Sequence, residues 1–196
     1  LWNLNNDIVP GYRALSDAVH AEGGRILAQL AHSGGTVLIN QSGLESWAAS
    51  PVRSEINGNI AHEMTLAEIH EVIDAHAEGA KRTAAGGMDG VEILGAFGFL
   101  PQAFLSPLTN HRTDKYGGAL KNRLRFLMEL LEAVRGALGR DHVLGVRLPG
   151  DEFEPGALDL EQMKIICKQI ADTGLIDYLN IIAHTNITHL GRSSHW

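Results

Sequence analysis

Hydrophobic residues along this chain alternate between short unbroken runs and longer stretches in which they recur every three or four positions. Runs of Val, Ile and Leu that are nearly continuous are typical of parallel strands buried on both faces. The sequence predicts four such strands, at residues 25–31, 90–94, 143–148 and 178–183.

The stretches between these runs have the period of amphipathic helices and recognisable ends. Thr65 and Glu68 are spaced as a capping box, in which the side chain of each residue accepts a hydrogen bond from the main-chain N–H of the other. Asp159 is a good N-cap for the last helix, and glycines follow each apolar stripe. Helices are therefore predicted to begin near Pro10, Thr65, Leu120 and Asp159 and to end near Gly23, Gly86, Gly139 and Gly174.

Strands that alternate with helices indicate an α/β fold of repeated βαβ units around a parallel sheet. An open doubly wound sheet and a closed (β/α)8 TIM barrel both satisfy the right-handed crossover rule. Long segments follow the predicted strands at 33–64, 95–119 and 149–158, which favours the barrel. Because a full barrel takes about 250 residues, we expect residues 1–196 to be one partial TIM-barrel domain. It would be a central fragment of about four βα units that lacks the first and last strands.

Composition narrows the functional classes. The chain is 44% hydrophobic and 20% charged, with a formal net charge of −7, which argues against a nucleic-acid-binding protein. No apolar run approaches the roughly 18 residues of a membrane span. A single cysteine, Cys167, excludes an internal disulfide and favours a reducing, cytoplasmic compartment. Its place on an inward helix face predicts a packed, unreactive thiol.

Two polar side chains interrupt the predicted strands. Gln29 lies in the sequence QLAHSGG, where a buried amide needs partners. Neighbouring backbone or a flat heterocycle with donor and acceptor edges would satisfy it. Arg147 lies in GVRLPGDE and cannot lose its proton. Either an internal ion pair with an acidic residue of the next strand or an anionic ligand or cofactor would satisfy it.

Other motifs argue against several kinds of site. Residues 95–118 lack the third glycine and acidic partner of a dinucleotide fingerprint. The histidines do not have metal-ligand spacing, so no metal site is predicted, and no G-x-S-x-G elbow indicates a serine hydrolase. Five cationic side chains are predicted to form a solvated surface with local pairs to Asp114 and Glu129: Arg112, Lys115, Lys121, Arg123 and Arg125.

Taken together, four segments of the chain resemble the Old Yellow Enzyme family of FMN-dependent oxidoreductases. They are QLAHSGG, residues 89–126, VLGVRLPGDE and DYLNII, and they match in order over nearly the whole chain. The most specific part is SPLTNHRTDKYGGALKNRLRF at 106–126. Within the family, the GDE after Arg147 and the DYLNII strand are most similar to the trimethylamine dehydrogenase and N-methylproline demethylase branch.

The resemblance implies FMN at the carboxyl end of the barrel, with NADH or NADPH as electron donor and a small-molecule substrate. Gln29 would bond the pyrimidine edge of the flavin, and Arg147 would lie beside flavin N1 and O2, where a cation favours the reduced form. His32 would support the site from behind. Asn122 and Arg123 would brace the loop that precedes their helix. A homo-oligomer is possible in the full-length protein.

The chain departs from the family's enone reductases at three pocket positions. There a His-x-x-His or His-x-x-Asn pair grips the substrate carbonyl and a tyrosine donates a proton. This sequence has Leu94, Phe97 and Phe99 instead, so we assign no catalytic residue. An apolar, aromatic pocket suits an alkylated amine, because aromatic faces attract ammonium groups. The alternatives are an NAD(P)H-dependent enone or dienoyl reductase whose acid comes from another segment, and a non-catalytic barrel fragment unable to hold FMN alone.

Overall fold

The computed structural model describes residues 3, 5–36, 45–53, 58 and 60–183. Its main sheet has four parallel strands in the order β1, β4, β5 and β6. These are β1 (Leu27–Leu30), β4 (Gly90–Leu94), β5 (Val143–Pro149) and β6 (Tyr178–Ile182). They coincide with the four predicted runs, and their order across the sheet is the same as their order along the chain.

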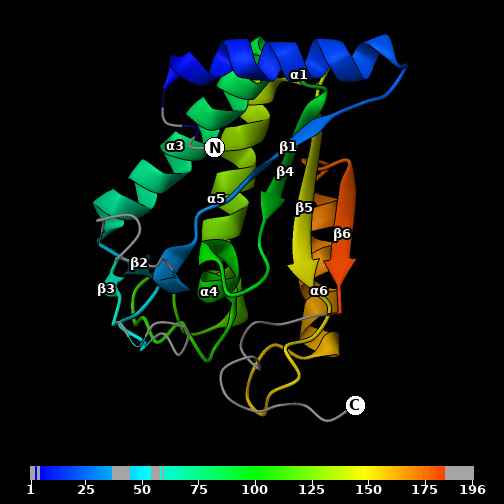
Figure 1. Cartoon of the computed structure of the whole chain (residues 1–196). Helices are drawn as coiled ribbons and strands as arrows, with labels where there is room; N and C mark the ends of the chain where they lie inside the picture. The colour runs from blue at the N-terminus through cyan, green and yellow to red at the C-terminus, as the bar shows by residue number, and fades with distance from the viewer. Residues whose placement is uncertain (1–2, 4, 37–44, 54–57, 59, 184–196) are drawn as a thin grey trace.

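Helices cover one face of this sheet and its two ends. They are α1 (Val9–Ala21), α3 (Leu66–Ala85), α4 (Leu100–Leu105), α5 (Leu120–Leu138) and α6 (Leu160–Asp172). Helices α3, α5 and α6 share one hydrophobic core with the strands. Helix α1 crosses the end at which the strands begin, and α4 lies at the end where they finish (Figure 1).

The predicted helix ends are confirmed. Thr65 Oγ1 accepts a hydrogen bond from the Glu68 N–H at 3.2 Å, and the Glu68 carboxylate accepts one from the Thr65 N–H at 2.7 Å. Asp159 caps α6 by accepting from the Gln162 N–H at 2.8 Å. Gly139 follows α5 with φ of 72°, a left-handed conformation that glycine adopts without strain.

Alternation along the strands separates a helix-facing side from a second side. The helix-facing side includes five fully buried residues: Val91, Ile93, Leu144, Val146 and Leu148. The positions between them, which we call the inner face, carry Gln29, Glu92, Leu94, Gly145, Arg147, Tyr178 and Asn180. Because core packing fixes which residues are buried, it also fixes which polar residues gather on the inner face.

Three short elements at the carboxyl end of the sheet were not predicted. Helix α4 lies within the segment expected to be a loop, with Pro101 in its first turn. The pairing strands β2 (Trp47–Ala48) and β3 (His62–Glu63) form a small parallel sheet of their own. Such elements are too short for a hydrophobic period to be detected, so neighbouring contacts decide their conformation.

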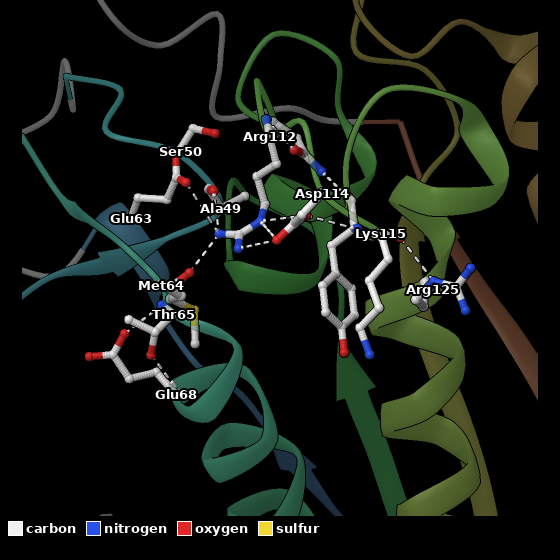
Figure 2. A network of polar contacts seen from close by, with 12 residues as sticks. Ala49, Ser50, Glu63, Met64, Thr65, Glu68, Arg112, Asp114, Lys115 and Arg125 are labelled. Carbon is white, nitrogen blue, oxygen red and sulfur yellow. Dashed lines mark hydrogen bonds and ion pairs between the residues drawn. The ribbon is translucent and has the colours of Figure 1, made fainter.

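Buried arginines hold the loops at this end together. Arg112 donates to the carbonyls of Ala49 at 3.1 Å and Met64 at 2.6 Å, and it pairs with Asp114 at 2.6 Å (Figure 2). Through these bonds one side chain links the segment before α5 to the β2 and β3 region.

Arg123 is placed in a similar way, bonding the carbonyls of Leu105 and Gly118. Arg112 is 7% exposed and Arg123 is 8% exposed, so the predicted solvated surface is wrong for both. Main-chain carbonyls accept from Arg123, and Arg112 divides its donors between two carbonyls and the Asp114 carboxylate. The predicted local pair of Arg112 with Asp114 is therefore confirmed. The bracing role of Asn122 and Arg123 is confirmed, since Asn122 bonds the Gly117 carbonyl at 3.0 Å.

Among the helices in the described part of the chain, none combines the length and apolar character that a bilayer crossing requires.

Candidate functional site

A carboxylate on the inner face gathers donors from two other strands. Glu92 of β4 accepts hydrogen bonds from Gln29 Nε2 of β1 at 2.7 Å. It also accepts from the Tyr178 hydroxyl at 3.1 Å and Asn180 Nδ2 at 2.9 Å, both of β6. Burial, with the nearby carboxylate adding to it, raises the pKa of Tyr178 to about 12. The phenol therefore stays protonated and donates to Glu92 at neutral pH.

Gly145 makes this arrangement possible. It pairs in register with both Glu92 and Tyr178 and lies between them on β5. A Cβ at this position would lie 2.1 Å from Cζ of the Tyr178 ring, well inside contact distance. Because Gly145 has no side chain, the tyrosine ring crosses β5 and its hydroxyl reaches Glu92.

Arg147 lies one inner-face position beyond Gly145, toward the carboxyl end of β5. It pairs in register with Leu94 and Asn180. Its Nε is buried and has no hydrogen-bond partner among the described residues. Leaving such a donor unpaired costs about 1–3 kcal/mol. The guanidinium lies 5.0 Å from the centre of the Phe97 ring, a cation–π contact.

Gln29 and Arg147 lie on the same face and on strands that flank β4. Strand geometry puts them about 10 Å apart across the sheet and about 7 Å apart along it. The ion pair considered for Arg147 is not present within the described residues: the next strand, β6, carries no acidic residue, and Glu92 of β4 pairs in register with Gly145 instead. Gln29 bonds this carboxylate, not neighbouring backbone as one prediction had it.

The three predicted pocket residues come from the end of β4 and the turn that follows. Leu94 is the last residue of the strand and is 5% exposed. Phe97 has φ of 61°, unusual for an aromatic residue, and Phe99 is the N-cap of α4. Between them, the Gly98 N–H donates to Gln102 Oε1 at 2.8 Å. These residues therefore lie at the same edge of the sheet as Arg147.

A second buried carboxylate, Glu152, is connected to this turn through Gln102. Glu152 is 0% exposed and accepts from Gln102 Nε2 at 2.6 Å, the Ser106 hydroxyl at 2.7 Å and the Leu158 N–H at 2.9 Å. Burial raises the pKa of Glu152, and these donors act in the opposite direction. Glu152 thus connects the loop after β5 to the turn after β4.

His32 lies behind the same turn and is tied to it through the main chain. Its carbonyl accepts from the Leu100 N–H at 2.9 Å, and its Nδ1 accepts from the Gly34 N–H at 3.1 Å. Burial lowers the pKa of His32 to about 4, with His76 contributing. The ring is therefore neutral at pH 7 and can act as an acceptor at Nδ1. Its predicted supporting role stays a prediction.

Sequence reasoning missed Glu92, Tyr178 and Asn180. A signal was present, because a carboxylate in the apolar run GVEIL needs partners just as Gln29 and Arg147 do. Tyr178 and Asn180 also occupy alternate positions of their strand, which places them on one face. Within the described residues no group of three or more His, Cys, Asp or Glu could hold a metal ion.

Comparison with known proteins identifies relatives over almost the whole chain. Residues 2–195 match the model of the NADH:flavin oxidoreductase / NADH oxidase family. A metal reductase of Desulforamulus reducens is 41% identical over 176 residues, which cover 89% of this chain and 26% of the relative. A probable N-methylproline demethylase of Rhizobium meliloti is 42% identical over 183 residues, covering 93% and 27%.

Solved structures give the same result. Histamine dehydrogenase from Rhizobium sp. 4-9 superposes with a TM-score of 0.83 at 30% identity, covering 90% of this chain and 26% of that one. Other matches are named as dehydrogenases, an alkene reductase/demethylase and an NADH oxidase. The chain thus spans about a quarter of the first relatives it matches. The predicted TIM-barrel fold class and the predicted resemblance are confirmed.

Proposed function

The chain belongs to the NADH:flavin oxidoreductase / NADH oxidase family, and from this we propose that its inner face binds FMN in an oxidoreductase acting on a small organic substrate. The observation that supports this best is Arg147, whose buried Nε lacks a hydrogen-bond partner within the described residues. A flavin ring offers acceptors that suit an unpaired guanidinium donor. FMN, when bound, supplies the two-electron chemistry, with NADH or NADPH as the donor.

The inner face supplies complementary groups for such a ring. Gln29 uses one amide N–H on Glu92, so its carbonyl oxygen and second N–H are the groups proposed to meet the pyrimidine edge. Arg147 adds a fixed positive charge that favours a reduced, more negative flavin. The Phe97 ring lies against the guanidinium, with its centre 5.0 Å away. His32 would hold the turn from behind.

We further propose an alkylated amine as substrate, with oxidative N-demethylation as the reaction. Leu94, Phe97 and Phe99 provide an apolar, aromatic wall at the carboxyl edge. Phe97 already contacts Arg147, which leaves Phe99 as the aromatic face best suited to an ammonium group. Relatives named as an N-methylproline demethylase and an N,N-dimethylglycine/sarcosine dehydrogenase support this substrate class.

Arg147→Met in the intact protein tests the proposed cofactor site. Wild type should show flavin absorption bands that bleach under anaerobic NADH or NADPH. Loss of one charge-assisted hydrogen bond is worth about 1.5–3 kcal/mol, so FMN affinity should fall about 10- to 100-fold. Lys121→Met removes an exposed charge and is the matched control. Unchanged FMN affinity in Arg147→Met would contradict the proposed site.

Enone reduction is the second candidate, favoured by relatives named as an alkene reductase and an alkene reductase/demethylase. Phe99→Tyr separates the two reactions, because it restores a phenolic proton donor at the position where the family's reductases carry one. If the acid is the missing element, 2-cyclohexenone reduction should rise about 10²-fold or more with FMN binding intact. Rapid enone turnover by the unmodified protein would instead contradict the amine preference.

A further inference from the structure

We propose that Glu152 is a positioning residue that acts through Gln102 to hold the Phe97–Phe99 turn against Arg147. The positioning is a property of this chain alone, and its consequence for flavin and substrate rests on the proposed function. The contacts join two segments at both of their ends. Arg147 and Glu152 belong to β5 and the loop after it, while the Phe97–Phe99 turn and Gln102 follow β4. Phe97 contacts Arg147, and Gln102 bonds Glu152.

The first step is the polarity that Glu152 imposes on Gln102. An ionised carboxylate only accepts hydrogen bonds. Of the two ends of the Gln102 amide, only the NH2 group can therefore face Glu152, at 2.6 Å. Gln102 is 0% exposed, so water cannot compensate for the wrong orientation. Because the amide is rigid, its oxygen is then directed toward the turn.

The second step is the use of that oxygen. Gln102 Oε1 accepts the Gly98 N–H at 2.8 Å. Gly98 follows Phe97, which is held at φ of 61°, a left-handed conformation that is strained for an aromatic residue. Such a conformation persists only where surrounding contacts enforce it. The Gly98 bond is one such contact, and the Phe97 ring beside the Arg147 guanidinium is another.

Glu152 itself is fixed by two groups besides Gln102. The Ser106 hydroxyl and the Leu158 N–H both donate to its Oε2, while Gln102 donates to its Oε1. The two oxygens therefore have different tasks. Oε2 anchors the carboxylate to α4 and its own loop, and Oε1 determines which way the Gln102 amide faces.

Glu152→Gln breaks this order without changing the size of the side chain. The new amide has one acceptor oxygen and one NH2 group, so one main-chain N–H must lose its acceptor. If its NH2 group faces Gln102, the Gln102 amide must turn and the Gly98 bond is lost. If its NH2 group faces Leu158 instead, the Leu158 bond is lost. The proposal requires the loss at Gly98.

The double variant Glu152→Gln/Gln102→Glu restores every bond with the charge moved from one side chain to the other. The new carboxylate at position 102 would accept from both the Gly98 N–H and the NH2 group at position 152. The amide oxygen at position 152 would accept from Ser106 and Leu158. Net charge and volume equal those of the wild type. A role in packing alone would not produce rescue of the single variant by a second change at a buried position.

The test is hydrogen exchange of the intact protein, followed in the peptides that contain Gly98 and Leu158. We expect Gly98 exchange to quicken about fivefold or more in Glu152→Gln, as a lost hydrogen bond requires, and to return to the wild-type rate in the double variant. Glu154→Gln, an exposed charge change in the same loop, is the matched control. Unchanged Gly98 exchange, acceleration at Leu158 alone, or failure of the double variant to restore the rate would overturn the proposal.

The visible spectrum of bound FMN is the second measurement. Displacement of Phe97 from Arg147 should shift the flavin bands in Glu152→Gln, and the double variant should reverse the shift. A wild-type protein without flavin bands would count against the proposed function only, because the exchange rates decide the positioning role separately. Flavin bands that do not move while Gly98 exchange quickens would show that the turn is positioned by Glu152 but does not reach the cofactor.

Discussion

The two ends of the sheet differ in one arginine of each end: within the described part of the chain, Arg135 is paired at every side-chain nitrogen, and Arg147 is not. Where the strands begin, Arg135 is 5% exposed and each of its three side-chain nitrogens has a hydrogen-bond partner. It donates to the carbonyls of Leu175 at 2.6 Å, Gly139 at 2.8 Å and His142 at 2.8 Å, and pairs with Asp177 at 2.6 Å. Where the strands finish, Arg147 retains a buried donor without a partner among the described residues.

Aspartates at the beginning of the strands repeat the pattern of full pairing. Asp89, just before β4, accepts from His20, Arg25 and the Ile26 N–H, each at 2.8 Å. These bonds hold the pKa of Asp89 far below its usual range, with His20 the largest cause. A bond from the Leu144 N–H is the largest cause of the lowered pKa of Asp177.

The difference shows which end of the sheet stabilises the fold and which end is available for chemistry. Charges that are fully paired within the chain have no capacity left for a ligand, whereas an unpaired buried donor does. In βα barrels the amino end of the strands is the end associated with stability, and the carboxyl end carries the active site. In Figure 1, α1 crosses the first of these ends and α4 lies at the second.

Arg135→Met should produce the largest loss of stability. It would leave three main-chain carbonyls without their donor, at about 0.5–1.5 kcal/mol each, while the Asp177 carboxylate is 51% exposed and adds little. The expected loss is therefore about 2–4 kcal/mol. The free energy of unfolding of the intact protein, measured in urea, checks this. Arg147→Met is the contrasting variant: with flavin removed from both proteins, so that lost FMN affinity does not enter, it should not lower that free energy, since its buried Nε has no partner to lose among the described residues. Equal losses in the two variants would remove the distinction between the ends.

Gly145→Ala should have an intermediate effect. The new Cβ would displace the Tyr178 ring and break its bond to Glu92, an overpacking that costs about 1–3 kcal/mol. The melting temperature checks the loss. Gly136→Ala is the matched control, because nothing lies within 4 Å of the added atom and alanine is favoured in a helix by about 0.5–1 kcal/mol. Additional destabilisation by Gly145→Ala in a Tyr178→Ala background, where the ring is gone, would contradict this explanation.

The pH dependence of stability should also differ between the two ends. Of the stability changes predicted here, this one is the smallest. His32 at the carboxyl end has a pKa of about 4 when folded, against 6.5 as its ordinary value. The unfolded chain therefore binds the additional proton, and stability falls as pH drops from about 6.5 toward 4. Asp89 and Asp177 have lowered pKa values, so their contribution is lost only at more acidic pH.

Urea unfolding of wild type and His32→Gln at pH 7 and pH 4.5 measures the histidine contribution directly. The wild-type loss should exceed that of the variant by about 1 kcal/mol, after allowance for partial exposure of the ring. A variant that loses as much stability as the wild type would show that His32 is not the group responsible.

Local patterns were sufficient for the elements and for part of the site. The four strands, the Thr65 and Glu68 box and the Asp159 cap all depend on residues a few positions apart, and all are confirmed. Gln29 and Arg147 could be singled out because a polar group within an apolar strand requires a partner. The identity of the family followed from motifs that extend over nearly the whole chain.

The sequence by itself thus determined a parallel α/β arrangement and two polar residues on its inner face, because strand and helix periods are local properties of the chain. Only the tertiary structure decided what those residues meet. Gln29 and Glu92 are 63 positions apart, and Asn180 is 88 positions from Glu92. The same holds for the burial of Arg112 and for the link from Glu152 through Gln102 to Gly98. Strand register and the absence of a side chain at Gly145 set the partners of Glu92. The packing of loops that are far apart in the sequence sets those of Arg112 and Glu152. No local pattern specifies either.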